Sequence, residues 1–262
     1  MRIIIVILLI AVIIPLNGCL GVEERYKAIK SDLEEVLEIY KAEINDLKSQ
    51  PTSYEEHDSG LKYPKTETIT NYVEPTDSNV RNQALEIVTG NPSGINADAD
   101  SWKIWSIFYW VSQNIQYVTD PKGQEYFQFA HETLQTKAGD CDDYSILLAS
   151  MYESVGLDSA LAFMDTDDEP GIDHVTCFVY WADDSQSFLS EEQLILRKMG
   201  LRSPTGQVYI YYWETSAMPS LLGKYDEGIW ITADGTMTEV RGLVGYVMHE
   251  PYVAIEIIDV GG

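Results

Sequence analysis

Positive charge is scarce in this sequence. Of its 262 residues, 17 are lysine or arginine and 42 are aspartate or glutamate, so the formal net charge is −25. Because such a surface repels phosphate, we expect no nucleic-acid partner. A solvated acidic shell is the simplest interpretation of the charge, and a specific cationic partner is the alternative.

Histidine and cysteine are scarce as well, at four and three residues. They do not stand at the spacing of zinc ligands, and we expect neither a metal nor another cofactor. The acidic residues 165–173 suggest calcium, but the glycine and the glutamate of this loop are misplaced for an EF-hand. A solvated loop between two strands is therefore the preferred interpretation.

Two of the cysteines, Cys141 and Cys177, could form a disulfide in an exported protein. We favour a free Cys177 instead. It stands three positions after His174 on a predicted strand, so these two side chains should lie on opposite faces. If His174 faces Cys141, Cys177 is then a small core residue.

The longest apolar run lies at residues 3–16, directly after Arg2. It is too short and too early for an ordinary membrane span, and it ends in Leu-Asn-Gly-Cys at residues 16–19. This ending resembles the lipobox of exported lipoproteins. The resemblance implies a signal peptide over residues 1–19, lipidation of Cys19, and a chain held in the cell membrane outside the cytoplasm. An uncleaved signal anchor is the alternative, and it places the chain on the same side.

The remaining chain divides into three predicted segments. Residues 20–50 have apolar residues at three- and four-residue steps, which predicts an amphipathic helix or stalk, with coiled-coil pairing as an alternative. Residues 51–79 contain three prolines and many polar residues, which is typical of a linker. Residues 80–262 form the predicted domain. One helix is expected at 80–88, a second begins at a cap at Ser101, a third runs from Cys141 to a C-cap at Gly156, and a fourth lies at 191–199. Strands are expected at 159–164, 175–181, 207–213, 228–232 and 253–258.

The most informative motif is the segment Gly-Asp-Cys-Asp-Asp at residues 139–143, which is followed by an apolar run. It predicts that Cys141 lies in the first turn of a buried helix capped by Asp140. The free backbone N–H groups and the helix dipole favour a thiolate there. The charges of Asp140, Asp142 and Asp143 would oppose it if they face the sulfur. The alternative is a buried structural cysteine.

Two further residues could act with this cysteine. His174 opens an alternating run, and Asp234 closes a short apolar run. A cysteine, a histidine and an aspartate, each at the edge of a regular element, are what an acyl-transfer enzyme needs. His131 could line the same cleft. Trp110 and Tyr126 are candidates for an oxyanion partner or a cleft wall, with core packing as the alternative.

These motifs together resemble the transglutaminase-like domains of microbial proteins. The resemblance covers residues 100–240 and rests on Glu-Thr-Leu at 132–134, on the cysteine block, on His-Val at 174–175 and on Trp-Ile-x-x-Asp at 230–234. It implies an α+β, papain-like fold in which a central helix with the cysteine packs on an antiparallel sheet. It also implies that Cys141 is the nucleophile, His174 the general base and Asp234 the residue that orients the imidazole. The chain departs from the family before Glu-Thr-Leu and at Gly235, where many relatives have proline.

The sequence thus predicts a membrane-tethered thiol enzyme that acts on amide bonds of a protein or peptide substrate. A thioester forms on the cysteine, and water or a second amine resolves it. The first outcome describes a cysteine protease or other hydrolase, and the second a transglutaminase-like acyltransferase. The alternative is a catalytically inactive module of the same fold that binds peptides or cell-surface polymers. The substrate and the oligomeric state are not predicted.

Overall fold

The structure is a computed structural model. It describes residues 66–121, 126–166, 171–201, 211–218, 224–225, 227–236, 243–245 and 253–261. All of these residues lie in one compact unit, Asp58–Gly262. The expected signal peptide, the lipidation site Cys19 and the helix of residues 20–50 lie outside the described residues. Within the described part of the chain, no helix is long and apolar enough to cross a membrane.

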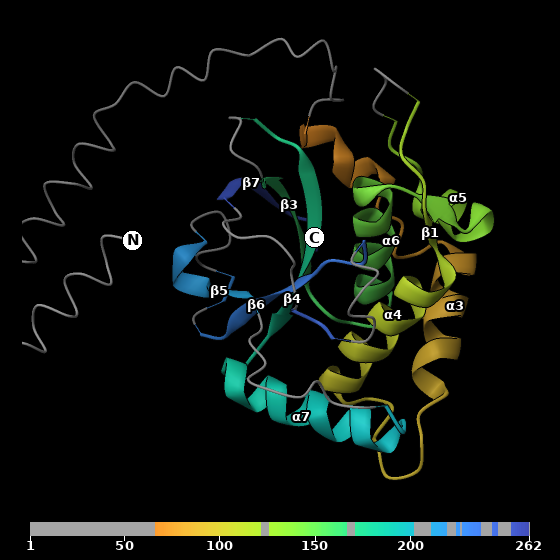
Figure 1. Cartoon of the computed structure of the whole chain (residues 1–262), viewed down its shortest axis with the longest axis vertical. Helices are drawn as coiled ribbons and strands as arrows, with labels where there is room; N and C mark the ends of the chain where they lie inside the picture. Colours follow the sequence, from red (N-terminus) through yellow and green to blue (C-terminus); the bar gives the residue numbers. More distant parts are fainter. Residues whose placement is uncertain are drawn as a thin grey trace, which may run out of the picture. The chain divides into compact units, whose positions relative to one another are not determined.

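The domain consists of a group of helices packed on one antiparallel sheet (Figure 1). The strand order in the sheet is β5-β6-β4-β3-β7. Its strands are β3 (Ser159–Asp165), β4 (His174–Trp181), β5 (Tyr212–Glu214), β6 (Ile229–Ala233) and β7 (Val253–Asp259). The helices include α3 (Ser78–Thr89), α4 (Asp100–Asn114), α5 (Ala130–Thr136), α6 (Cys141–Ser154) and α7 (Ser185–Lys198). The expected α+β fold class is confirmed.

Helix α6 occupies the centre of the domain. It lies between the sheet and the helices α3, α4 and α5, and it packs on β4 along its length (Figure 1). Of its 14 residues, 12 are buried. The hydroxyl of Ser145 donates a hydrogen bond to the carbonyl of Val175 at 3.0 Å, so the first turns of α6 lie beside the first residues of β4. The start of the helix and the start of the strand therefore meet at one end of the domain.

The central strands β3 and β4 are largely buried on both faces of the sheet. Leu161 and Val175 belong to the large core that also contains the apolar residues of α6. Ala162 and Phe178 belong to a second, smaller core on the other face, together with Trp230. This arrangement explains why β3 and β4 read as nearly continuous apolar runs in the sequence.

Cys177 is a free, buried cysteine, as expected. Cys177 lies on the face of β4 that packs against α6, in the same core as Val175, so the sheet does not separate it from Cys141. Its separation from Cys141 has a different cause. The pKa of Tyr152 is raised by burial and then by Cys177, which places Cys177 near the last turns of α6, whereas Cys141 begins the helix. Eleven residues of helix correspond to about 16 Å.

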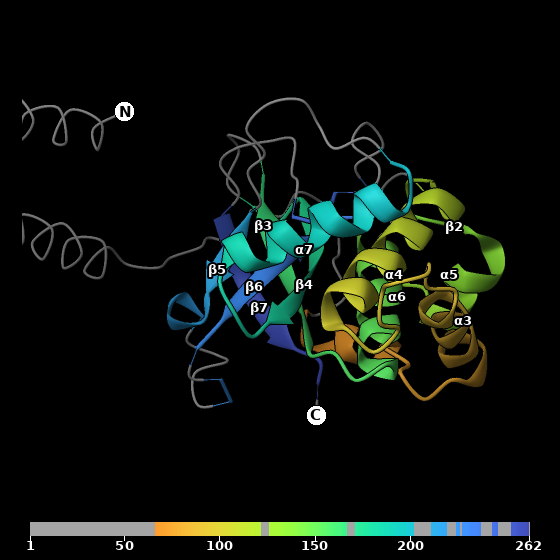
Figure 2. The same ribbon diagram turned by 90° about the horizontal axis from the view of Figure 1, so that it is seen from below.

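The helix boundaries follow from their caps. Asp77 accepts hydrogen bonds from the backbone of Asn79 and Val80, so α3 begins two residues earlier than expected. Ser101 is not a cap, because α4 already begins at Asp100 and Ser101 is buried inside it. Asp184 accepts a hydrogen bond from the Ser187 backbone at 2.7 Å, and α7 begins at Ser185. Helix α7 packs against α4 (Figure 2).

Part of the expected linker packs on the domain. Residues Thr66–Tyr72 form the short 3-10 helix η1, in which Ile69 is fully buried in the large core. The ring of Tyr72 lies 5.6 Å from that of Phe127 and 4.8 Å from that of Phe129. The compact part of the chain therefore starts before residue 80.

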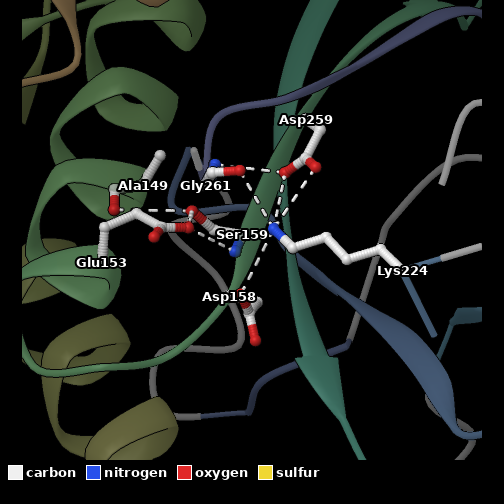
Figure 3. Close-up of polar contacts among 7 residues, drawn as sticks. All are labelled: Ala149, Glu153, Asp158, Ser159, Lys224, Asp259 and Gly261. Atoms are coloured by element: carbon white, nitrogen blue, oxygen red, sulfur yellow. Dashed lines mark hydrogen bonds and ion pairs between the residues drawn. The ribbon is translucent and has the colours of Figure 1, made fainter.

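Polar contacts fix the last described strand, β7, to the rest of the domain (Figure 3). The ammonium of Lys224 lies 3.3 Å from Asp259, 3.4 Å from Asp158 and 3.0 Å from the carbonyl of Gly261. Beside it, the carboxylate of Glu153 accepts hydrogen bonds from the backbone and the hydroxyl of Ser159. The end of α6, the start of β3 and the end of β7 are joined in this way.

Candidate active site

The cysteine of the central motif is the first residue of α6. A two-residue strand, β2 (Ala138–Gly139), leads directly into Asp140, which has an extended backbone and caps the helix. The backbone N–H of Asp140 donates to Asp143 at 3.3 Å. Cys141 is partly exposed, whereas nearly all the helix behind it is buried. The thiol thus stands at the positive end of the helix dipole, on a residue that is partly exposed.

His174 and Asp234 meet beside this helix start. His174 is the first residue of β4, and Asp234 directly follows β6. Because β4 and β6 are antiparallel neighbours, the end of β6 lies at the start of β4. The Nε2 atom of His174 lies 2.9 Å from Oδ2 of Asp234. The three residues that the sequence singled out are therefore brought together.

The charge state of His174 reflects its two neighbours. Burial lowers the pKa of His174, but the charge and hydrogen bond of Asp234 raise it, and the hydrogen bond with Cys141 raises it further. The net result is a pKa well above the ordinary histidine value. Since Nε2 is occupied by Asp234, Nδ1 is the ring nitrogen left for the thiol. Such an imidazole is suited to hold a proton taken from a thiol.

Asp234 is itself held in place by the next turn. Burial raises the pKa of Asp234, but His174 and then Thr236 lower it, and the net shift is downward. The hydroxyl of Thr236 donates to Oδ1 of Asp234 at 2.6 Å, and the Thr236 backbone N–H donates at 3.1 Å. The intervening Gly235 lies against Tyr144, whose Cδ1 would be 2.8 Å from an added Cβ. The aspartate is therefore a fixed anion on the far side of the imidazole.

The three aspartates around the nucleophile form one buried cluster. Carboxylate oxygens of Asp140, Asp142 and Asp143 lie within 4.8 Å of one another. Burial and the adjacent Asp140 raise the pKa of Asp142 far above the usual aspartate range, and burial raises that of Asp143 to about 7. Asp143 also accepts hydrogen bonds from the backbone and side chain of Gln128. At neutral pH Asp142 is therefore protonated, and it adds no full negative charge beside Cys141.

Other expected candidates have different roles. The Nδ1 atom of His131 lies 2.6 Å from the carboxylate of Glu74, and the ring of Trp110 lies under the ammonium of Lys137 at 4.3 Å. Because the ring of His131 is bonded to Glu74, His131 does not interact with Cys141 and His174 through that nitrogen. Tyr126 is exposed. His57, His249 and the middle of the acidic loop 165–173 lie outside the described residues.

Two residues near the site were missed from the sequence. Thr236 holds Asp234, and Tyr117 on the short strand β1 (Gln116–Tyr117) lies close enough for Cys141 and Asp234 to act on its hydroxyl. For Thr236, the spacing Asp-Gly-Thr after an apolar run was the available signal, since Asp and Thr two residues apart often bond locally. For Tyr117 no local signal exists, because its position depends on a strand of two residues.

Comparison with known families finds one matching family model, described as the transglutaminase-like superfamily, at residues 92–221. The matched region contains Cys141 and His174 and ends before Asp234. No curated protein matches the chain.

Two solved structures are similar to the chain. One is named a "putative protease" from Parabacteroides distasonis, with a TM-score of 0.33 and 12% identity over 43% of this chain. The other is named a "putative cysteine protease" from Cytophaga hutchinsonii, with a TM-score of 0.32 and 13% identity over 73% of this chain. The chain spans 24% of the first protein and 55% of the second.

Proposed function

The chain carries a domain of the transglutaminase-like superfamily, and from this premise we propose that it is a thiol enzyme that cleaves or exchanges amide bonds. The reaction passes through a thioester on Cys141. The observation that carries the proposal is the 2.9 Å contact between His174 and Asp234 at the start of the helix that begins with Cys141. A nucleophile, a base and a group that orients the base are the minimum that this chemistry needs.

The first half of the reaction forms the thioester. Nδ1 of His174 takes the thiol proton, and Sγ of Cys141 attacks the carbonyl carbon of the amide. The C–N bond then breaks, and the imidazolium gives its proton to the leaving amine. Asp234 keeps the ring oriented and stabilises its positive charge.

The second half of the reaction releases the acyl group. Water or a second amine attacks the thioester carbon, His174 accepts a proton from the attacking group, and the C–S bond breaks as the thiol is restored. With water the products are those of a cysteine protease or amidase, and with an amine those of an acyltransferase. The ratio of hydrolysis to amide exchange, measured on one substrate with and without an added primary amine, separates these two activities.

The proposal is tested by the labelling rate of Cys141 with iodoacetamide at pH 6–7, followed by peptide mapping. We expect fast labelling in the wild type and slow labelling in His174→Ala, because the variant loses the proton acceptor. His131→Ala is the matched control, since His131 pairs with Glu74 instead. Equal, slow labelling of Cys141 in all three proteins would overturn the proposal and favour a binding module.

We also propose that the enzyme is held outside the cytoplasm by a lipid on Cys19. The support is the apolar run of residues 3–16 and the Leu-Asn-Gly-Cys ending at residues 16–19. Mass spectrometry of the protein extracted from membranes tests this. A lipidated Cys19 as the first residue is expected, and an intact Met1 terminus would contradict the proposal.

A further inference from the structure

Tyr117 is fixed beside the nucleophile by backbone pairing. Strand β1 runs parallel to β2, and Tyr117 lies opposite Gly139, two residues before Cys141. The backbone N–H of Gln116 donates to Lys137 at 2.8 Å, and that of Val118 donates to Gly139 at 2.9 Å. The strand that carries Tyr117 is therefore bonded to the strand that leads into the nucleophile.

The first turns of α6 hold the same segment from the other side. Tyr144 is buried on α6, and its hydroxyl donates to the carbonyl of Ile115. The rings of Tyr117 and Tyr144 lie 6.4 Å apart between centroids. Tyr117 nevertheless keeps 45% of its surface exposed, whereas Tyr144 keeps 3%. Tyr117 is thus held by its backbone beside the start of α6, and its side chain is partly accessible to solvent.

The charges that act on Tyr117 come from both halves of the site. Partial burial is the main cause that raises the pKa of the Tyr117 hydroxyl, and the nearby Cys141, Asp140 and Asp234 raise it further. Asp234 follows β6 and the others belong to the start of α6, so charged groups of both elements act on the Tyr117 hydroxyl. The hydroxyl therefore stays protonated at physiological pH and is available as a hydrogen-bond donor.

We propose that the hydroxyl of Tyr117 and the backbone N–H of Cys141 together bind the oxyanion of the tetrahedral intermediate. This rests on the proposed thiol chemistry. When Sγ adds to the carbonyl carbon, the carbonyl oxygen becomes an anion, which accepts a hydrogen bond from each of the two donors. When the C–N or C–S bond breaks, the carbonyl group forms again. Tyr117 is therefore a fourth catalytic residue, which donates a hydrogen bond to the oxyanion.

The test compares two reactions of the same thiol in the full chain. Acylation by p-nitrophenyl acetate passes through an oxyanion, whereas alkylation by iodoacetamide is a displacement at a saturated carbon and forms none. In Tyr117→Phe we expect the acylation burst to slow by roughly 10²-fold, a typical loss for one oxyanion donor. The alkylation rate of Cys141 should stay within about twofold, since the hydroxyl is not needed to activate the thiol.

Three further proteins make the result specific. Tyr126→Phe removes a hydroxyl from an exposed tyrosine of the neighbouring segment and should react like the wild type. Tyr117→Trp keeps an N–H donor and should recover part of the acylation rate. Cys141→Ala should show no burst. Thermal melting of each variant shows that a slow reaction does not come from a misfolded protein.

Two results would overturn the assignment of Tyr117. One is wild-type acylation in Tyr117→Phe, and the other is an equal loss of acylation and alkylation, which would mean that the hydroxyl acts on the thiol. Failure of the proposed function looks different, because the wild type would then show neither an acylation burst nor fast alkylation of Cys141.

Discussion

Asp142 directly follows Cys141 and is buried in its protonated form. Burial and the proximity of Asp140 raise the pKa of Asp142 far above the value of about 3.9 that an aspartate has in the unfolded chain. The folded state therefore binds this proton more tightly than the unfolded state. The stability that the proton adds is fully present below the unfolded pKa and is lost as the pH rises toward the folded pKa.

The substitution Asp142→Asn tests this at the residue scale. The amide keeps a hydrogen-bond donor toward Asp140 but cannot ionise in the unfolded chain. We expect the wild type to lose stability between pH 5 and pH 8 and the variant to lose clearly less, as measured by urea unfolding at both pH values. Asp98→Asn, at a side chain that is 88% exposed, is the control and should follow the wild type. An unchanged pH dependence in Asp142→Asn would contradict the protonated state.

Thr236→Val tests the support of the Asp234 carboxylate. The variant loses the 2.6 Å hydrogen bond to Asp234 and leaves a buried carboxylate oxygen with one donor fewer. A hydrogen bond to a charged group contributes about 1.5–3 kcal/mol, so unfolding free energy should fall by an amount in this range. Cys141 labelling should slow as well, because the imidazole is less firmly oriented. Thr236→Ser keeps the hydroxyl and should restore both; a slow Ser variant would show that the methyl group, not the hydrogen bond, is important.

At this scale the sequence singled out the three residues that the structure brings together, and it missed their neighbours Thr236 and Tyr117. Cys141, His174 and Asp234 each stand at the edge of an apolar run, and such a run can be recognised in a single sequence. The protonation of Asp142 and the position of Tyr117 depend on contacts with segments that are distant along the chain. No local pattern carries that information.

At the scale of elements, the turn from β2 into α6 is the tightest part of the site. Gly139 lies so close to Asp143 that a Cβ added at Gly139 would be 2.5 Å from the Cβ of Asp143. The close approach lets Asp143 accept hydrogen bonds from Gln128 and Asp140 at the same time. The glycine therefore sets the position of the helix start and of Cys141.

Gly139→Ala is expected to destabilise the protein by about 1–3 kcal/mol, the range for forcing extra atoms into a packed site. Cys141 labelling should slow too, since the helix start must shift. Gly90→Ala is a suitable control, because Gly90 has an ordinary φ of −77° and its nearest neighbour atoms are backbone oxygens at 3.3 Å or more. Urea unfolding of the two variants measures the difference. Equal stability would show that the turn can relax without displacing Asp143.

Element boundaries could be predicted where a cap or an apolar run marks them. The strands β3, β4, β6 and β7 lie within one residue of their expected ends, and a left-handed Gly156 follows the end of α6. Helix α7 begins six residues before its expected start, because its first turns are polar and are defined by the Asp184 cap. The pair β1 and β2 is too short for any periodicity to show.

At the scale of the whole molecule, the fold class was predictable and the strand order was not. The last strand, β7, pairs with β3, and β5 and β6 lie on the other side of β4. Since β3 and β4 are buried on both faces, the pattern of apolar residues in their sequences does not show which strand lies beside which. The order follows from contacts across the chain.

The net charge of −25 also belongs to this scale. Self-repulsion destabilises a compact state, and salt screens it, with a Debye length of about 30 Å at 0.01 M falling to about 3 Å at 1 M. We expect the melting temperature to rise when sodium chloride is raised over this range. Calcium chloride at equal ionic strength is the comparison: an equal rise indicates screening, and a melting temperature that falls or stays constant with salt would contradict the repulsion.

We propose that Cys141 forms an acyl intermediate with the help of His174. The most direct measurement is mass spectrometry of the full chain after brief reaction with p-nitrophenyl acetate at pH 6.5, with peptide mapping of the adduct. We expect one acetyl group on Cys141 in the wild type and none in His174→Ala. A wild type without an adduct on Cys141, or an adduct that survives the loss of His174 unchanged, would contradict it.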